Sequence, residues 1–199
     1  MVSGRSLERI NVAVRHAVAL GFEDLQRPVV PSLAEVLDDL ASHRILPTRL
    51  DAETLRLNGI GDVTCGGPRG DNGLSGKKLV VDHYGPQVPI GGGALCGKDP
   101  HKPDRVEPLR ARQLAVRLAA ASARAATVHL SWLHGLQAPD RRTGRLADVT
   151  ALDGDGIATL VPVPDLTLAG SARDLELAGV PWPTAITSGY DGAGWRWYS

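Results

Sequence analysis

The residue types best suited to chemistry in this chain lie in two glycine-rich segments, residues 66–85 and 90–105. Together these segments contain four lysines and four aspartates. Glycine allows backbone N–H groups to converge in tight turns, and lysine adds a point charge that suits phosphate groups. Aspartate can hold Mg²⁺ or a substrate ammonium group. The combination predicts a site for a polyphosphate and a divalent metal ion.

The order and spacing of these residues resemble the central and C-terminal part of the S-adenosylmethionine synthetases. That family carries GGPxGDxGLTGRK, IxVDTYGG and GGGAFSGKDPxKVDRS in this order. In the first segment the matching residues are Gly66, Gly67, Pro68, Gly70, Asp71, Gly73, Leu74, Gly76, Lys78, Val81, Asp82, Tyr84 and Gly85. In the second segment they are Gly91, Gly92, Gly93, Ala94, Gly97, Lys98, Asp99, Pro100, Lys102, Asp104 and Arg105. Because family members are about twice as long as this chain, the resemblance implies a shortened and divergent member.

The resemblance implies roles for individual residues. Lys98, Lys78 and Lys102 match lysines that contact the triphosphate, and they are the candidate catalytic residues. Asp71 matches an aspartate on the methionine side, and Asp104 matches an aspartate associated with Mg²⁺ and phosphate. The other candidates for substrate or phosphate binding are Lys77, Gly92, Gly93 and Gly97. Lys77 stands where the family has arginine, so the charge is kept but the bidentate fork is lost.

Three of these candidates also have plainer interpretations. Asp104 and Glu107 have the spacing of a helix capping box. Asp71, within Gly-Asp-Asn-Gly, is typical of a turn, and Lys77 would fit a solvated strand edge. The sequence leaves these alternatives open.

The second segment also resembles a nucleotide-binding P-loop, but the match fails at two points. Asp99 follows Lys98 where that loop needs a serine or threonine to bind Mg²⁺. Pro100 and Pro103 oppose a helix that would start at the lysine. We therefore do not predict a P-loop.

On the adenine side the chain departs from the family pattern. None of the six histidines lies in the GHPDK-type segment that begins the family's substrate-binding text. Where the family reads PTGRF, Asp62 replaces the arginine and Val63 replaces the phenylalanine that stacks on adenine. By analogy with base–aromatic contacts, losing such a platform removes on the order of 1–3 kcal/mol. The sequence thus keeps the phosphate side of the pattern and weakens the adenine side.

The resemblance implies a methionine adenosyltransferase-like enzyme that uses ATP or a triphosphate with Mg²⁺ and forms S-adenosylmethionine or a related sulfonium. A monovalent cation is an optional second ion, and a methionine-like molecule is the second substrate. Because active sites in the family lie between two subunits, we expect a homodimer, or a hetero-oligomer with a chain that carries the missing N-terminal motif. The alternatives are hydrolysis of tripolyphosphate alone, or a non-catalytic regulatory or binding subunit of a synthetase.

Composition restricts the other partners. The chain has 22 basic and 22 acidic residues, so no charge excess indicates nucleic acid. No apolar run approaches the roughly 20 residues that a membrane span requires. The two cysteines are too few for a disulfide scaffold, and the first residues lack a signal-peptide pattern. We expect a cytoplasmic protein.

Residue patterns predict the elements that position the candidate site. Helices are expected at 6–20, 32–42 and 104–124, strands at 54–58, 77–84 and 127–133, and turns at 141–144 and 153–156. This order predicts an α+β fold in which a mixed β-sheet carries helices on one face, similar to the repeated unit of the family. We expect a synthetase-like domain at 1–144 and a C-terminal extension of unknown role at 145–199, packed on that domain or at an interface.

Overall fold

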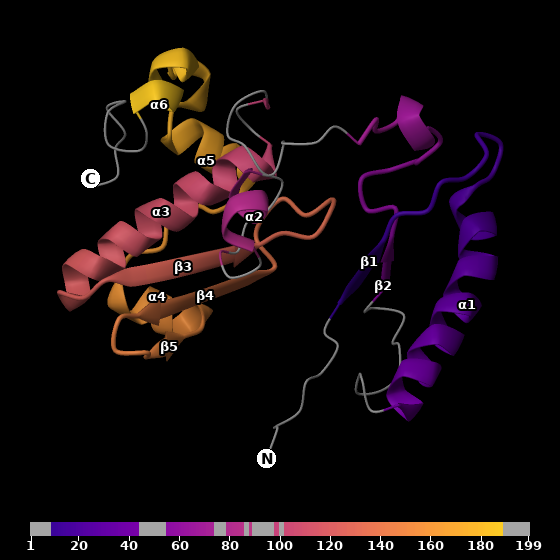
Figure 1. Ribbon diagram of the computed structural model, residues 1–199, viewed down its shortest axis with the longest axis horizontal. Coiled ribbons are helices and arrows are strands. Elements are labelled where there is room, and N and C mark those ends of the chain that lie inside the picture. Colours follow the sequence, from indigo (N-terminus) through magenta and orange to yellow (C-terminus); the bar gives the residue numbers. More distant parts are fainter. Residues whose placement is uncertain are drawn as a thin grey trace. The chain divides into compact units, whose positions relative to one another are not determined.

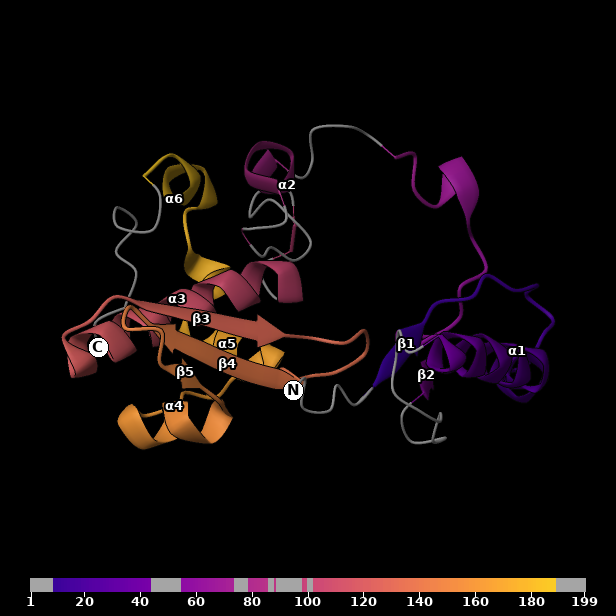
Figure 2. The same ribbon diagram turned by 60° about the horizontal axis from the view of Figure 1, so that its bottom comes forward.

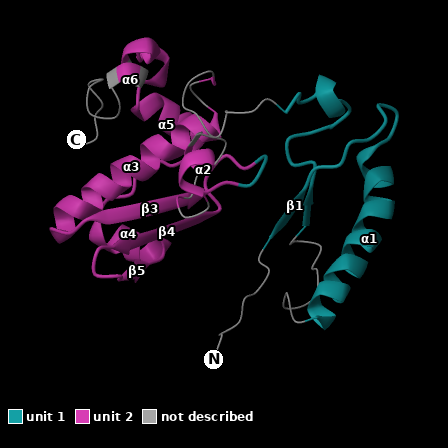
Figure 3. Cartoon of the chain, viewed as in Figure 1, with its two compact units in different colours: residues 1–73, 133–135 teal, residues 74–132, 136–199 magenta. Residues whose placement is uncertain are grey.

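The computed structural model describes residues 9–43, 55–73, 79–85, 88, 98–99 and 102–188 (Figure 1). The chain forms two compact units, and each is described by itself. Unit 1 comprises residues 1–73 and 133–135, and unit 2 comprises residues 74–132 and 136–199 (Figure 3). Within the described ranges, no helix is both long enough and apolar enough to cross a membrane.

Unit 1 is built on a short parallel strand pair and one long helix. Strand β1 (Ile10–Val12) pairs with β2 (Leu55–Leu57), and helix α1 spans Phe22–Ser42. The buried Asn58 side chain prolongs this pairing, because its Oδ1 accepts from the Val14 N–H at 2.7 Å and its Nδ2 donates to the Val14 carbonyl at 3.1 Å. A 3₁₀ turn, η1 (Gly67–Arg69), follows within the first glycine-rich segment.

Unit 2 holds an antiparallel sheet in the order β3-β4-β5, formed by Ala126–Ser131, Arg141–Leu146 and Ala151–Leu152. Its α-helices are α2 (Leu79–Tyr84), α3 (Pro103–Ser122), α4 (Gly154–Leu160), α5 (Leu168–Asp174) and α6 (Trp182–Ser188), with a 3₁₀ turn η3 at Leu177–Gly179. In two views α3 lies along β3, and α6 lies on the side of α3 away from the sheet (Figure 1, Figure 2).

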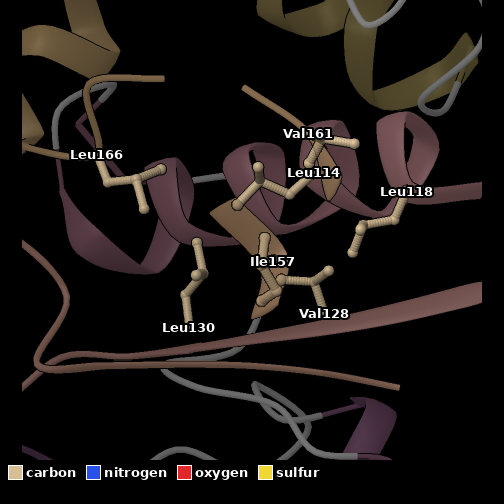
Figure 4. Close-up of a cluster of buried hydrophobic side chains, with 7 residues drawn as sticks. All are labelled: Leu114, Leu118, Val128, Leu130, Ile157, Val161 and Leu166. Carbon is tan, nitrogen blue, oxygen red and sulfur yellow. The ribbon is translucent and has the colours of Figure 1, made fainter. Parts of the chain in front are cut away.

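One face of the unit 2 sheet carries the main core. Its seven buried side chains come from α3, β3, α4 and the segment after α4, and are Leu114, Leu118, Val128, Leu130, Ile157, Val161 and Leu166 (Figure 4). A Cβ on Gly144 of β4 would lie 3.4 Å from Ile157, so α4 packs directly over this position of the sheet. The alternate residues of β3, which include Thr127 and His129, are exposed on the opposite face. Helices therefore cover one face of this sheet.

A second cluster joins the first half of α3 to the C-terminal segment. Val106 and Leu109 of α3 are fully buried against Leu175 and Leu177, with Trp182 packed at the edge. This contact makes the C-terminal segment part of the support for the start of α3.

A buried arginine crosses the same interface. The Arg110 side chain is 1% exposed, and it donates to Ser171 Oγ at 2.8 Å and to Asp174 Oδ2 at 2.9 Å. It also donates to Gln113 Oε1 at 2.7 Å and to the Asp165 carbonyl at 3.0 Å. Burial lowers the pKa of this guanidinium, and the hydrogen bond to Asp174 opposes that shift. The charge is accepted in the interior because its donors have partners.

The α+β prediction with helices on one sheet face is confirmed. Both parallel and antiparallel strand pairs occur, in separate sheets of the two units. The strands at 54–58 and 127–133 and the helix at 104–124 are confirmed as β2, β3 and α3. The helix at 32–42 is confirmed as the second half of α1, which starts ten residues earlier and continues through Pro28 and Pro31.

Three predicted elements are wrong. Residues 10–12 of the expected 6–20 helix form a strand instead, because pairing with β2 satisfies their backbone groups. Residues 79–84 of the expected 77–84 strand form α2, a helix that bonds its backbone internally. The expected 141–144 turn lies in β4, where it pairs with β3. The expected turn at 153–156 forms the start of α4, with Asp153 accepting from the Gly156 N–H as its N-cap.

The domain boundary predicted after residue 144 falls inside β4, which spans Arg141–Leu146. Residues on both sides of that point share the core of unit 2. The two compact units instead divide after residue 73.

We expect Arg110→Ala to lower the free energy of unfolding by about 3 kcal/mol, because it removes the buried guanidinium that is bonded to Ser171, Gln113 and the Asp174 carboxylate. The control is Arg124→Ala, which removes an exposed ion pair to Asp148 and should cost less than about 1 kcal/mol. Urea denaturation measures both variants. Equal losses would show that the Arg110 contacts contribute no more than a surface pair.

Candidate functional site

The start of α3 is shaped by a proline and a turn that precedes it. Lys102 occupies the N-cap position with extended backbone (φ −68°, ψ 142°), and Pro103 takes the first helical position, where its fixed φ is favourable. The Lys102 carbonyl accepts from the N–H groups of Arg105 and Val106 at 2.9 and 3.0 Å. A helix of 20 residues thus begins here, and its positive dipole end is formed by the last residues of the second glycine-rich segment.

The central feature of this region is an ion pair between Lys98 and Asp104. Lys98 Nζ donates to Asp104 Oδ2 at 2.7 Å, with the two side chains 20% and 36% exposed. The Lys102 N–H donates to the Asp99 carbonyl at 3.1 Å, so a turn carries Lys98 back toward the first helical turn. Two groups predicted from the motifs to handle phosphate and metal are therefore in contact.

Asp104 does not cap the helix, and the capping-box interpretation of Asp104 and Glu107 is wrong. The N-cap is Lys102, and no side chain makes a capping hydrogen bond there. The helix starts one residue earlier than predicted, because Pro103 is itself a suitable first residue. The Asp104 carboxylate is thereby directed to Lys98 instead of to the backbone.

Glu107 joins this region as a residue that the sequence suggested only as a capping partner. Burial, and to a smaller extent the nearby Asp104 carboxylate, raise its pKa from 4.5 to about 7. The available signal was the three-residue spacing from Asp104, which places both carboxylates on one side of the helix.

Sequence reasoning also missed the support of the site from the C-terminal segment. Arg105, the neighbour of Asp104, is 3% exposed, and its guanidinium carbon lies 3.8 Å from the centroid of a Trp182 ring. No local pattern links residues 105 and 182, because the contact depends on tertiary packing.

Asp71 lies in unit 1, whereas Lys98, Lys102 and Asp104 lie in unit 2. The exposed Asp71 accepts from the Gly73 N–H through Oδ1 at 3.0 Å, which is the hydrogen bond of an Asx turn. The local structure thus contains the turn that was the plainer interpretation of Asp71, and its role on the methionine side stays a prediction.

The adenine-side positions of unit 1 contact His16. The Val63 N–H donates to His16 Nε2 at 3.3 Å, and the His16 N–H donates to the Val63 carbonyl at 3.0 Å. An Asp62 carboxylate oxygen lies 3.6 Å from the same imidazole nitrogen. His16, Asp62 and Val63 therefore stabilise the local chain path.

The remaining predicted site residues lie outside the described residues: Lys77, Lys78, Gly92, Gly93 and Gly97. The structure brings together Lys98, Lys102 and Asp104 at the start of α3, with Lys102 exposed. Two lysines near a helix N-terminus form a favourable environment for an oligoanion. In the part of the chain that the structure describes, no cluster of three or more His, Cys, Asp or Glu could by itself hold a metal ion.

Known proteins provide an independent comparison. The sequence model of the family described as "S-adenosylmethionine synthetase, C-terminal domain" matches residues 65–192. The S-adenosylmethionine synthase of Mycolicibacterium paratuberculosis is 36% identical over 178 residues, covering 86% of this chain and 43% of that protein. The one from Rhodospirillum centenum is 38% identical over 141 residues, covering 69% of this chain and 35% of that protein. The chain thus spans less than half the length of these curated relatives.

Among solved structures, an unusual S-adenosylmethionine synthetase from Campylobacter jejuni is similar, with 26% identity, a TM-score of 0.43, and coverage of 87% of this chain and 45% of that chain.

The family match also extends well past residue 145, where the recognisable motifs end. The segment that contains α4, α5 and α6 therefore belongs to the matched region.

We expect stability to fall as pH rises from about 5 to 8, through Glu107. Its pKa of about 7 exceeds the ordinary 4.5, so the folded protein binds more protons than the unfolded chain between these values. The stabilising effect of the protonated carboxyl is complete below pH 4.5 and is lost as pH rises through 7. Between pH 5 and pH 8, the wild-type chain should lose about 2 kcal/mol more unfolding free energy than Glu107→Gln does.

Urea denaturation at pH 5 and pH 8 measures this difference. Glu35→Gln, at an exposed position of α1, is the control for removing one carboxylate. A parallel pH dependence of the wild-type chain and Glu107→Gln would rule out this role for Glu107.

Proposed function

The chain belongs to the S-adenosylmethionine synthetase family, and we propose that it is a methionine adenosyltransferase-like enzyme acting on ATP or a triphosphate with Mg²⁺. Its product would be S-adenosylmethionine or a related sulfonium. The observation that carries the proposal is the Lys98–Asp104 contact at the start of α3, because it joins two residues of the family motif in one charged site.

The reaction makes modest demands on proton transfer and large demands on charge stabilisation. The methionine sulfur attacks C5′ of ATP, the C5′–O bond breaks, and the electron pair leaves with the triphosphate. Cations held at fixed positions stabilise the charge that develops on the leaving group. We assign this task to Lys98 and Lys102, together with the N-terminal end of α3. Lys78 and Lys77 would extend the same surface, as the motif resemblance implies.

The residues at the start of α3 also suit Mg²⁺. This ion is commonly held by one or two carboxylates together with substrate phosphates, so a complete cage of protein ligands is not needed. Asp104 would hold it, since its carboxylate is partly exposed and lies at the predicted phosphate side. When bound, the ion would neutralise charge on the phosphate chain. A monovalent cation stays a prediction from the family resemblance.

We further propose that a second subunit completes the site, either another copy of the chain or a partner with the histidine-containing N-terminal motif. The family resemblance supports this proposal, because such sites draw residues from two subunits. Lys98 and Asp104 would supply the phosphate side of the shared site, and the partner would supply the residues that the 199-residue sequence lacks.

The second candidate is hydrolysis of tripolyphosphate without adenosyl transfer. The arrangement around Val63 favours it, because this position contributes an aliphatic side chain where the family stacks an aromatic ring on adenine. Its backbone is also held by His16. Tripolyphosphate requires no adenine platform, and the contact between Lys98 and Asp104 supports this candidate.

Adenosyl transfer is tested with the full chain, ATP, methionine and Mg²⁺, with S-adenosylmethionine measured by mass spectrometry. We expect no product from the chain alone and product after adding a family member that carries the N-terminal motif, itself inactivated by substitution of its triphosphate lysines. Phosphate release from tripolyphosphate is measured in parallel. Product from the chain alone would exclude the need for a partner of a different sequence. If neither product nor phosphate forms under any condition, both enzymatic proposals fail, and a non-catalytic regulatory or binding subunit is the remaining alternative.

A second prediction concerns competition within the Lys98–Asp104 pair. To bind Lys98, a phosphate anion must displace the Asp104 carboxylate from the Lys98 ammonium group. A cation bound to Asp104 assists this exchange, because it neutralises the displaced carboxylate. We therefore expect Asp104→Asn to bind tripolyphosphate several-fold more tightly than the wild-type chain without Mg²⁺, and to lose the enhancement by Mg²⁺. Lys98→Ala should weaken binding at least tenfold in both conditions.

Isothermal titration calorimetry with tripolyphosphate, with and without MgCl₂, measures these affinities. Arg124→Ala removes one arginine at the opposite end of α3 and is the charge-matched control. Equal losses in Lys98→Ala and Arg124→Ala would indicate a general charge effect and remove Lys98 from the site.

A further inference from the structure

The first turn of α3 is also held by a residue that points away from the ion pair. Arg105 directly follows Asp104, and its side chain is 3% exposed, whereas the Asp104 side chain is 36% exposed. Successive helical residues point about 100° apart. One residue of this turn therefore faces the candidate site while the next enters the interior.

Trp182 covers that buried arginine. The Arg105 guanidinium carbon lies 3.8 Å from the centroid of a Trp182 ring, which is the geometry of a cation–π contact. A guanidinium is poorly accommodated in the interior unless it has compensating contacts, and the ring face supplies one where the charge has little access to water.

Apolar contacts fix the position of the tryptophan. Trp182 and Val180 pack against the cluster of Val106, Leu109, Leu175 and Leu177, which joins α3 to the C-terminal segment. Trp182 is the first residue of α6, and its backbone N–H donates to the Val180 carbonyl at 2.9 Å. This hydrogen bond forms a tight turn directly before the helix. In Figure 1, α5 and α6 lie at the same end of unit 2. The ring thus contacts both the charge of Arg105 and the apolar side of the same helix.

We propose that Trp182 is a positioning residue for the candidate site: by stacking on Arg105 it fixes the first turn of α3, and so the orientation of Asp104 toward Lys98. The link to tripolyphosphate rests on the proposed function. Trp182 contacts Arg105, the neighbour of Asp104, and acts on the ion pair through it. The C-terminal segment, whose role the sequence left open, becomes a support for the phosphate side.

The test compares Trp182→Phe, which keeps a ring face, with Trp182→Leu, which keeps only apolar bulk. Hydrogen exchange of the Arg105 and Val106 amides, both bonded to the Lys102 carbonyl, reports the order of the first turn without any ligand. We expect at least tenfold faster exchange in Trp182→Leu, a change within threefold in Trp182→Phe, and unchanged exchange at Leu114 and Leu118. The matched control is Trp132→Leu, because Trp132 packs on the other core of unit 2.

The second measurement is calorimetric affinity for tripolyphosphate with MgCl₂, using the same full-length variants, with melting temperatures recorded for each. We expect at least tenfold weaker binding in Trp182→Leu, rescue to within threefold in Trp182→Phe, and wild-type affinity in Trp132→Leu even where that variant melts earlier. Affinity that follows melting temperature across all three variants would overturn the proposal, as would unchanged first-turn exchange in Trp182→Leu.

The two measurements separate this inference from the proposed function. If the wild-type chain binds no tripolyphosphate while the exchange pattern is as expected, the proposed function fails and Trp182 still positions the turn. If the wild-type chain binds tripolyphosphate and Trp182→Leu binds it equally well, the positioning role fails and the proposed function stands.

Discussion

The structure of unit 2 depends on a charge that is kept in its interior. Arg110 is 1% exposed, and all of its contacts described above join α3 to itself or to the segment of residues 165–174. A buried guanidinium tolerates few alternative arrangements, because each one would leave a donor without an acceptor. Apolar contacts between Val106, Leu109, Leu175 and Leu177 stabilise the same interface but are not directional. Arg110 therefore sets the register of α3 against α5, and the apolar cluster stabilises it.

This register determines which side chains of the first turn of α3 face the candidate site and which are buried. Pro103 fixes where the helix begins, Arg105 directs one side of the first turn inward, and Asp104 is left facing Lys98. A surface ion pair on a mobile loop would contribute little. On a helix held by a buried charge and a packed cluster, the same pair has a defined geometry, which is what an electrostatic site requires.

The sequence predicts the parts of this site that depend on neighbouring residues better than the parts that depend on contacts between distant residues. The helix of α3 and the strand β3 follow from local periodicity, and the grouping of Lys98, Lys102 and Asp104 follows from motif spacing. Two local predictions failed where a distant partner decides. Residues 10–12 become a strand because β2 lies beside them, and Arg141–Leu146 becomes a strand because it pairs with β3. A third failed for a local reason, because the neighbouring Pro103 starts the helix and Asp104 is not its N-cap. The contacts of Arg110 with residues 165–174 and of Arg105 with Trp182 span 55 or more residues and have no local signal.

The two sides of the family motif have diverged to different degrees, and the structure gives a physical reason. Val63 and Asp62 contact His16 within unit 1, where their contacts stabilise the path of the chain. Lys98 and Asp104 are held within unit 2 by the interface between α3 and the C-terminal segment. These two sets of supporting contacts lie in different compact units. The contacts that hold Lys98 and Asp104 within unit 2 therefore support the proposed role in phosphate binding without reference to the altered positions of unit 1.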